Sequence, residues 1–210
     1  MFITFEGPEG AGKTTQVNLL AEALRADGRR VVTTYEPGGT ALGEDIRRIL
    51  LAPGGTISPR AEALLFVAAR SQLVDEVIRP ALARGEIVLC DRFSDSTIAY
   101  QAGGRGLARD AIESLITFAT GGLEPDLTFL LDLAATAGLN RKHGGSRTRL
   151  DLENLAFHER VRVMYLDLAR RFPDRIVVID AARPIDDIAR QIQAITRERL
   201  AARAGGERPR

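Results

Sequence analysis

The stretch Phe2-Ile-Thr-Phe-Glu-Gly-Pro-Glu-Gly-Ala-Gly-Lys-Thr-Thr-Gln16 decides the fold of this chain. Its first residues are mostly apolar and predict a short buried strand over 2–6. The segment from Gly7 to Thr14 then matches the pattern G-x-x-x-x-G-K-T, and apolar residues with helical spacing follow it. A strand, a glycine-rich turn and a helix form the context in which this pattern indicates a loop that binds phosphate groups.

The residue types in this loop suit that chemistry. Gly7, Gly10 and Gly12 allow the backbone to approach phosphate oxygens closely, and the start of the following helix adds a positive end. Lys13 supplies a mobile positive charge, and the hydroxyl of Thr14 can ligate magnesium. Lys13 and Lys142 are the only lysines among 29 basic residues, so a lysine at this position is informative. We therefore predict that the chain binds a nucleoside triphosphate.

Length and composition limit the number of domains, the kinds of partner and the cellular compartment that we expect. A chain of 210 residues, 45% of them hydrophobic, predicts one domain over 1–203, and its polar end over 204–210 predicts a disordered tail. The net charge of +1 gives no general attraction to nucleic acid or membrane. The single cysteine, Cys90, excludes an internal disulfide and favours a reducing compartment. No apolar run reaches the roughly 18 residues of a transmembrane helix, so we expect a cytoplasmic protein.

Strand and helix patterns alternate along the chain. The predicted strands are 2–6, 30–35, 86–90, 126–132 and 175–179. The predicted helices are 13–27, 41–51, 60–84, 108–119, 151–171 and 185–202. Such alternation indicates the α/β class, here a three-layer fold with a five-stranded parallel sheet flanked by helices. Ligands of these sheets bind at the carboxyl ends of the strands, so functional residues are sought there.

Charged residues follow two of the predicted strands. Glu36 ends the second strand, and Arg47 lies in the next helix; both are also explained as solvated surface charges. Asp91 and Arg92 end the third strand, next to the expected phosphate site. There Asp91 can hold magnesium through water, and Arg92 can face phosphates. The alternative is that Asp91 only caps a helix.

Two further stretches suggest ligand contacts. Phe66 and Arg70 are four residues apart and share a stripe of the predicted helix 60–84, where they could flank a flat ligand or form a core aromatic beside an ion-paired arginine. Gln101 could read the amide edge of a base. The run over 140–149, N-R-K-H-G-G-S-R-T-R, is either a solvated face or a mobile lid whose arginines close over transferring phosphate.

Together these motifs resemble those of bacterial thymidylate kinases, from Phe2 to about residue 200. The motifs that carry the resemblance are FEGPEGAGKTT at the phosphate loop, EPGGT at 36–40, R-x-E-x-x-L-F-x-A-x-R at 60–70 and DRF–S-T-x-A-Y-Q at 91–101. The resemblance implies a single nucleoside monophosphate kinase domain with a lid over about 140–150. It also implies transfer of the γ-phosphoryl group of MgATP to dTMP, giving ADP and dTDP for dTTP synthesis, by a homodimer.

The resemblance also implies individual roles. ATP would be bound by Gly7, Pro8, Glu9, Gly10, Ala11, Gly12, Lys13, Thr14 and Thr15. The dTMP acceptor would be bound by Glu9, Glu36, Pro37, Arg47, Phe66, Arg70, Arg92, Ser96, Thr97, Tyr100 and Gln101. Magnesium would be organised by Thr14, Asp91 and Glu36, partly through water. The catalytic side chains would be Lys13, Arg92, Arg147, Arg149 and Glu9.

Within the acceptor site, Phe66 would stack on thymine while Arg70 and Gln101 bond its edge. Arg47 and Arg92 would hold the monophosphate. The sequence departs from the family pattern at Tyr35, where an arginine is usual, and the lid aligns only loosely. The choice among the lid residues Arg141, Lys142, Arg147 and Arg149 therefore stays open.

Three alternative functions agree less well with the sequence. A deoxynucleoside kinase shares the loop and an Asp-Arg pair, but it has no need of Arg47 or EPGGT for an acceptor phosphate. A GTPase should carry an N-K-x-D motif, which this sequence lacks. A nucleotide-binding protein without activity is disfavoured by the intact set of Lys13, Thr14, Asp91 and Arg92.

Overall fold

The structure is a computed structural model that describes residues 1–141 and 148–204. Residues 142–147 of the predicted lid and residues 205–210 of the predicted tail lie outside the described residues. Within the described part, one or more helices separate each strand from the next, and the last helix ends at Ala204.

The centre of the fold is the predicted five-stranded sheet, with strand order β2-β3-β1-β4-β5. All pairings between neighbouring strands are parallel. The strands are β1 (Phe2–Glu6), β2 (Val31–Tyr35), β3 (Ile87–Asp91), β4 (Leu127–Asp132) and β5 (Ile176–Asp180). Each lies within one residue of its predicted bounds, so the fold class is confirmed.

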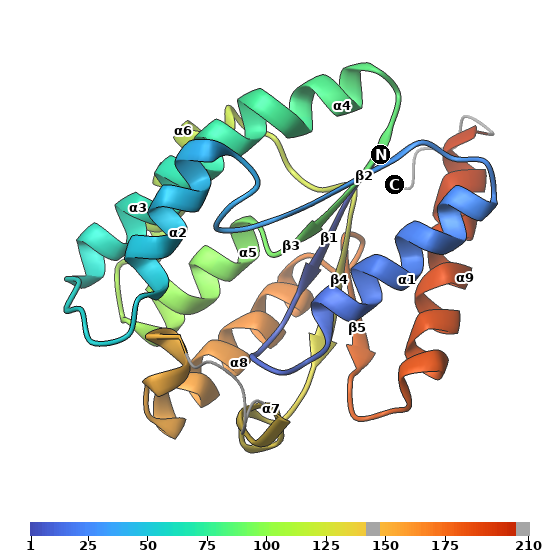
Figure 1. The fold of residues 1–210 in the computed structure, drawn as a ribbon. Helices are drawn as coiled ribbons and strands as arrows, with labels where there is room; N and C mark the ends of the chain where they lie inside the picture. The colour runs from blue at the N-terminus through green and yellow to red at the C-terminus, as the bar shows by residue number, and fades with distance from the viewer. Residues whose placement is uncertain (142–147, 205–210) are drawn as a thin grey trace.

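Helices cover both faces of this sheet (Figure 1). Ile3 and Phe5 of β1 point into a core shared with α1 (Lys13–Ala26) and α9 (Ile185–Ala204). Phe2, the neighbour of Ile3, points to the opposite face, as strand geometry requires. The core on that side also contains residues of α3 (Pro59–Leu73), α6 (Arg109–Thr120) and α8 (Leu155–Arg171). The layers are therefore helix, sheet and helix.

The remaining helices show where the predicted boundaries were wrong. The expected helix over 60–84 is α3, a π-helical turn (Val74–Ile78) and α4 (Arg79–Ala83). Pro80 has no N–H to donate to the preceding turn, which is a physical reason for the break. The expected helix 151–171 begins only at Leu155, after the N-cap Asn154, and a 3₁₀ turn spans Leu150–Leu152.

Other segments complete the chain. The helix α2 (Ala41–Leu51) has its predicted bounds. A short helix α5 (Ser94–Thr97) continues into a π-helical stretch (Ile98–Gly104). The helix α7 (Ala135–Arg141) was not predicted. Among the described residues, no helix has both the length and the apolar character to cross a membrane.

Candidate active site

The phosphate loop joins β1 to α1 at the carboxyl edge of the sheet. Gly7 has φ 137°, and a side chain there would come within 2.3 Å of the carbonyl oxygen of Leu131 in β4. Only glycine therefore fits this close approach. The ammonium group of Lys13 donates to the carbonyl oxygens of Gly7 (3.1 Å) and Pro8 (2.8 Å). Burial, and secondarily the charge of Arg92, lowers the pKa of Lys13 to about 8.

A hydroxyl and a carboxylate meet where α1 begins and β3 ends. The Thr14 hydroxyl donates to Oδ2 of Asp91 at 2.5 Å. These are the hard oxygen ligands that magnesium prefers, and magnesium commonly uses one or two protein oxygens together with phosphates and water. Among the described residues, no group of three or more His, Cys, Asp or Glu side chains could hold a metal by itself. The pair Thr14 and Asp91 therefore fits a magnesium ion that arrives with a nucleotide.

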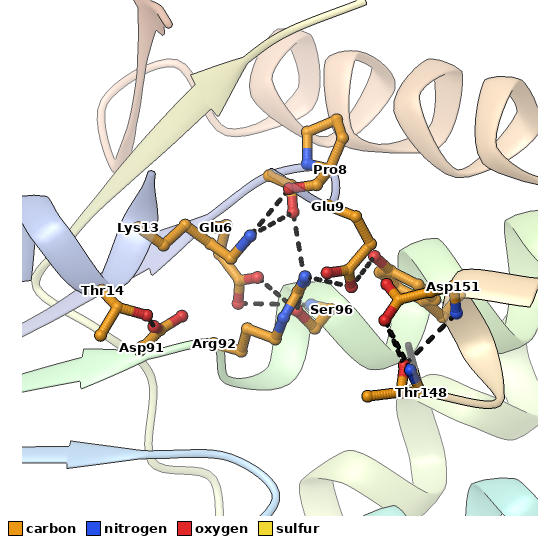
Figure 2. A network of polar contacts seen from close by, with 12 residues as sticks. Glu6, Pro8, Glu9, Lys13, Thr14, Asp91, Arg92, Ser96, Thr148 and Asp151 are labelled. Atoms are coloured by element: carbon orange, nitrogen blue, oxygen red, sulfur yellow. Dashed lines mark hydrogen bonds and ion pairs between the residues drawn. The ribbon is translucent and has the colours of Figure 1, made fainter. Parts of the chain in front are cut away.

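Arg92 is the hub of a polar network at the same edge (Figure 2). Its Nη2 donates to Glu9 Oε1 at 2.6 Å. Its Nη1 donates to the carbonyl of Gly7 at 3.1 Å and to the hydroxyls of Ser96 and Tyr165 at 3.2 Å each. The backbone of Arg92 has φ 70°, the only positive φ of a described residue other than glycine. The structure thus brings Arg92 against the phosphate loop.

Tyr100 also belongs to this network. Its hydroxyl donates to Glu9 Oε1 at 2.9 Å, and its ring lies 5.2 Å from the guanidinium carbon of Arg92. The sequence-predicted residues Glu9, Arg92 and Tyr100 are therefore in mutual contact.

Glu6 is a residue of this site that the sequence interpretation missed. It is buried at the end of β1, and its carboxylate accepts hydrogen bonds from the Phe93 N–H (2.8 Å) and from the hydroxyls of Ser96 (2.6 Å) and Tyr165 (3.1 Å). Burial, and next the charge of Asp95, raises the pKa of Glu6 to about 7. The available signal was an acid at the end of an apolar strand, next to the phosphate loop.

Arg70, which belongs to the predicted base site, is 1% exposed. Its Nε and Nη2 donate to both carboxylate oxygens of Glu36, and Nη2 also donates to the carbonyl of Phe93 at 3.0 Å. Burial raises the pKa of Glu36, and Arg70 opposes that rise. Nη1 of Arg70 has no hydrogen-bond partner among the described residues. One buried donor is therefore left to meet a ligand.

Glu36 was expected to help organise magnesium. Its two oxygens are instead engaged by Arg70, while Asp91 is the carboxylate next to Thr14. The helix positions of Phe66 and Arg70 had left open whether Arg70 is an ion-paired core residue or a ligand contact. The structure combines both features, because the guanidinium is ion-paired on one side and unpaired at Nη1.

One cavity of about 710 Å³ connects these groups. Most of the predicted site residues line it, and so does Arg141. Lining residues of the phosphate side include Glu9, Gly10, Gly12, Lys13, Thr14, Thr15 and Asp91. Lining residues of the acceptor side include Glu36, Pro37, Arg47, Phe66, Arg70, Arg92, Ser96, Thr97, Tyr100 and Gln101. Residues from both halves of the chain therefore converge on one cleft.

Arg47 and Tyr35 lie together at the β2 side of this cavity. Arg47 donates to the carbonyl of Pro37 at 2.8 Å, and its guanidinium lies over the Tyr35 ring at 5.2 Å. The Tyr35 hydroxyl donates to Glu44 at 2.6 Å. Tyr35, which departs from the family pattern, thus packs its ring against the guanidinium group of Arg47.

The two described arginines of the basic run lie in different places. Arg141 donates to the carbonyl oxygens of Gly10 (3.4 Å) and Ala181 (3.2 Å), beside the phosphate loop. Arg149 donates to Glu62 at 2.5 Å and to the carbonyl of Leu50 at 3.1 Å, so it is anchored to α3 and α2 instead. Lys142 and the predicted catalytic Arg147 lie outside the described residues.

Comparison with known proteins gives one consistent family. The family model described as Thymidylate kinase matches residues 5–192. The chain is 52% identical over 200 residues to a thymidylate kinase of Deinococcus radiodurans, covering 95% of this chain and 97% of that protein. It is 54% identical over 199 residues to one of Thermomicrobium roseum, covering 94% of each. The crystal structure of thymidylate kinase from Ehrlichia chaffeensis superposes with a TM-score of 0.77 at 35% identity, covering 93% of this chain and 98% of that one.

Proposed function

Because this chain belongs to the thymidylate kinase family, we propose that its central cleft transfers the γ-phosphoryl group of ATP to dTMP. The observation that carries the assignment of residues is the shared cavity. Its lining includes residues of the phosphate loop together with Phe66, Arg70 and Gln101, and Nη1 of Arg70 is buried with no hydrogen-bond partner among the described residues. A polyanion and a flat polar ring thus each have a matching surface.

ATP binds through the phosphate loop. Backbone N–H groups between Gly7 and Thr15 surround the phosphates, and the start of α1 adds its positive end. Lys13 leaves the carbonyls of Gly7 and Pro8 and pairs with phosphate oxygens. Arg141, already next to Gly10, is the described arginine that best fits a stabilising contact with the transferring group.

Thr14 and Asp91 would hold a magnesium ion that arrives with the nucleotide. When bound, the ion supplies charge neutralisation between phosphate oxygens. Because both oxygens of Glu36 are engaged by Arg70, we assign Glu36 to positioning that arginine. Because Arg149 is tied to Glu62, we assign it to anchoring the 148–153 segment, and the catalytic assignment of Arg147 stays a proposal.

The monophosphate of dTMP is held by Arg92 and Arg47, which bring the acceptor oxygen toward the phosphate loop. Positioning of two reactants in this way can supply about 7–11 kcal/mol of barrier reduction. The carboxylate of Glu9 accepts a hydrogen bond from the 3′-hydroxyl of the deoxyribose, and the ring of Tyr100 packs against the sugar. Both side chains are already fixed by contact with Arg92.

The base of dTMP is recognised at the end of the cavity away from the phosphate loop. Phe66 stacks on the ring, Nη1 of Arg70 donates to a carbonyl of thymine, and Gln101 bonds the neighbouring ring nitrogen. Ser96 and Thr97 lie beside the base. The order of donor and acceptor favours thymine and uracil over cytosine.

We also propose that the chain forms a homodimer through the layer of α2, α3 and α6. These helices are neighbours, because α3 packs against both of the others (Figure 1). Each carries an exposed large apolar side chain: Ile49 on α2, Leu64 on α3 and Phe118 on α6. A second copy of the chain would remove these side chains from water.

Coupled assays of ADP release test the activity directly. We expect turnover with MgATP and dTMP, weak turnover with dCMP and none with thymidine. Lys13→Ala should lose most turnover while its circular dichroism and melting temperature stay close to those of the natural chain. Phosphorylation of thymidine in preference to dTMP would instead identify a deoxynucleoside kinase.

A further inference from the structure

Three hydrogen-bonding side chains meet at one buried carboxylate beside the base site. Glu62 lies in α3 and is 0% exposed. Gln101 donates to its Oε1 from Nε2 at 2.9 Å. Arg105 donates to both of its oxygens at 3.1 Å, and Arg149 donates to Oε2 at 2.5 Å. The carboxylate is thus surrounded by three donor side chains, two from the segment 101–105 and one from Arg149.

These contacts keep Glu62 in its ionised form. Burial alone raises the pKa of its carboxyl group, but the hydrogen bonds from Arg105, Gln101 and Arg149 outweigh burial and lower the pKa below its usual value. An ionised carboxylate accepts hydrogen bonds and donates none. The side-chain amide of Gln101 can therefore meet Glu62 only through Nε2, and the opposite orientation of the amide would set two acceptor oxygens against each other.

The orientation of this amide determines what the ligand meets. Gln101 lines the same cavity as Phe66 and Arg70. Its Oε1 accepts no hydrogen bond from the residues that the structure describes, and so it is the group left for a ligand. We propose that Glu62 is a positioning residue which fixes the amide of Gln101 with its oxygen toward the base, and thereby enforces selection of thymine over cytosine.

The proposal rests on the function proposed above and adds the source of its selectivity. Thymine presents a carbonyl acceptor at position 4 and an N–H donor at position 3, which match a donor on Arg70 and an acceptor on Gln101. Cytosine presents an amino donor and a ring-nitrogen acceptor at the same positions, so both contacts become repulsive. Uracil shares the edge of thymine. Each of the two side chains proposed to contact the base is bonded to its own buried carboxylate: Arg70 to Glu36, and Gln101 to Glu62.

The test is Glu62→Gln in the full-length protein, assayed for kcat/KM with dTMP, dUMP and dCMP. A neutral amide at position 62 can accept or donate a hydrogen bond. The side-chain amide of Gln101 can then rotate and exchange the positions of its oxygen and nitrogen. We expect the ratio of kcat/KM for dTMP to that for dCMP to fall at least about tenfold, since a mismatched polar contact is costly in a buried site. The dTMP to dUMP ratio should stay unchanged, because those bases share the edge that Gln101 reads.

Glu153→Gln is the matched control. Glu153 pairs with Arg105 at 2.6 Å but makes no contact with Gln101, so this variant removes a carboxylate from the same arginine and should keep the natural dTMP to dCMP ratio. If Glu62→Gln does not fold, Glu62→Asp keeps the charge but withdraws it from Gln101 by one methylene, and the ratio should fall severalfold.

The outcomes separate the two levels of the proposal. A natural chain that fails to prefer dTMP over dCMP contradicts the proposed function itself. A natural chain that discriminates, together with a folded Glu62→Gln or Glu62→Asp variant that discriminates equally well, overturns the role of Glu62 alone. A lower melting temperature with an unchanged ratio would assign Glu62 to stability only.

Discussion

Lys13 holds its ammonium group against the carbonyl oxygens of Gly7 and Pro8, where burial lowers its pKa to about 8. The nucleotide-free protein therefore loses this charge as pH rises above about 8, and ATP must then bind to a neutral amine. We expect kcat/KM for ATP to be level near pH 7 and to fall toward tenfold per pH unit above the pKa of Lys13.

A pH profile of kcat/KM for ATP measures this effect. Lys13→Arg keeps a positive charge at every pH in the range, so any residual activity of that variant should lack the alkaline decline. A natural profile that stays level to pH 9.5 would contradict the assignment.

Glu6 gives a second titration, seen in stability. Folding raises its pKa from 4.5 to about 7, so between these values the native state binds more protons than the unfolded state. Its contribution to stability is therefore full below pH 4.5 and is lost as pH rises through 7. At about 1.4 kcal/mol per pKa unit, the loss over this shift amounts to roughly 3–4 kcal/mol.

Glu6→Gln cannot ionise and should escape this loss. Urea denaturation at pH 5, 6, 7 and 8 should show the variant gaining roughly 3 kcal/mol on the natural chain across the range. Parallel stability curves for the two proteins would rule out a titration of Glu6 in this interval.

Single residues also mark how far the sequence could be interpreted. The contacts among Glu9, Arg92 and Tyr100 follow from motifs whose family is recognisable. Glu6 was missed because its environment is built by residues distant in sequence, such as Tyr165, which is 159 positions away. Arg149 shares a basic run with Arg141, but only tertiary packing decides that it meets Glu62.

Among the elements, α7 and the phosphate loop pack backbone against backbone. A side chain on Gly138 would come within 2.0 Å of the carbonyl oxygen of Glu9, and one on Gly10 within 2.2 Å of that of Gly138. Gly138→Ala must therefore push α7 away from the loop. We expect a stability loss of about 1–3 kcal/mol, and a higher KM for ATP with little change in KM for dTMP.

Gly55→Ala is the control, because no described residue beyond its two chain neighbours has an atom within 4 Å of the added methyl group there. Calorimetry and steady-state kinetics on both variants provide the comparison. Equal KM values for ATP in Gly138→Ala and the natural chain would show that α7 does not set the shape of the loop.

The strands were predictable, and the helix ends less so. Short apolar runs bounded by turn residues located all five strands to within one residue of their bounds. The long apolar pattern over 60–84 hid the π-helical turn, since Val74–Ile78 keeps helical spacing and only Pro80 signals an interruption. The helix α7 was missed because it is short and contains Gly138, which disfavours a helix interior.

Phe118 is 89% exposed and lies on α6, which packs beside α3. If this layer forms the proposed homodimer interface, Phe118→Asp introduces a charge that must be buried without a partner. Sedimentation at micromolar concentration should then report a dimer for the natural chain and a monomer for the variant.

Val163→Asp is the control, because Val163 lies on α8 and is exposed to 61%. It should leave the dimer intact. A monomeric natural chain, or a Phe118→Asp variant that sediments as a dimer, would place the interface elsewhere or remove it.

The left-handed backbone at Arg92 has one more consequence. A side chain at φ 70° costs about 1–2 kcal/mol that glycine would not incur, yet this position carries the cation that meets the phosphate loop. The hydrogen bonds of Arg92 to Glu9, Gly7, Ser96 and Tyr165 offset that strain, so Arg92→Gly should relieve the backbone and still yield a less stable protein. The same side chain that would meet the phosphates therefore also holds the fold together at this edge of the sheet.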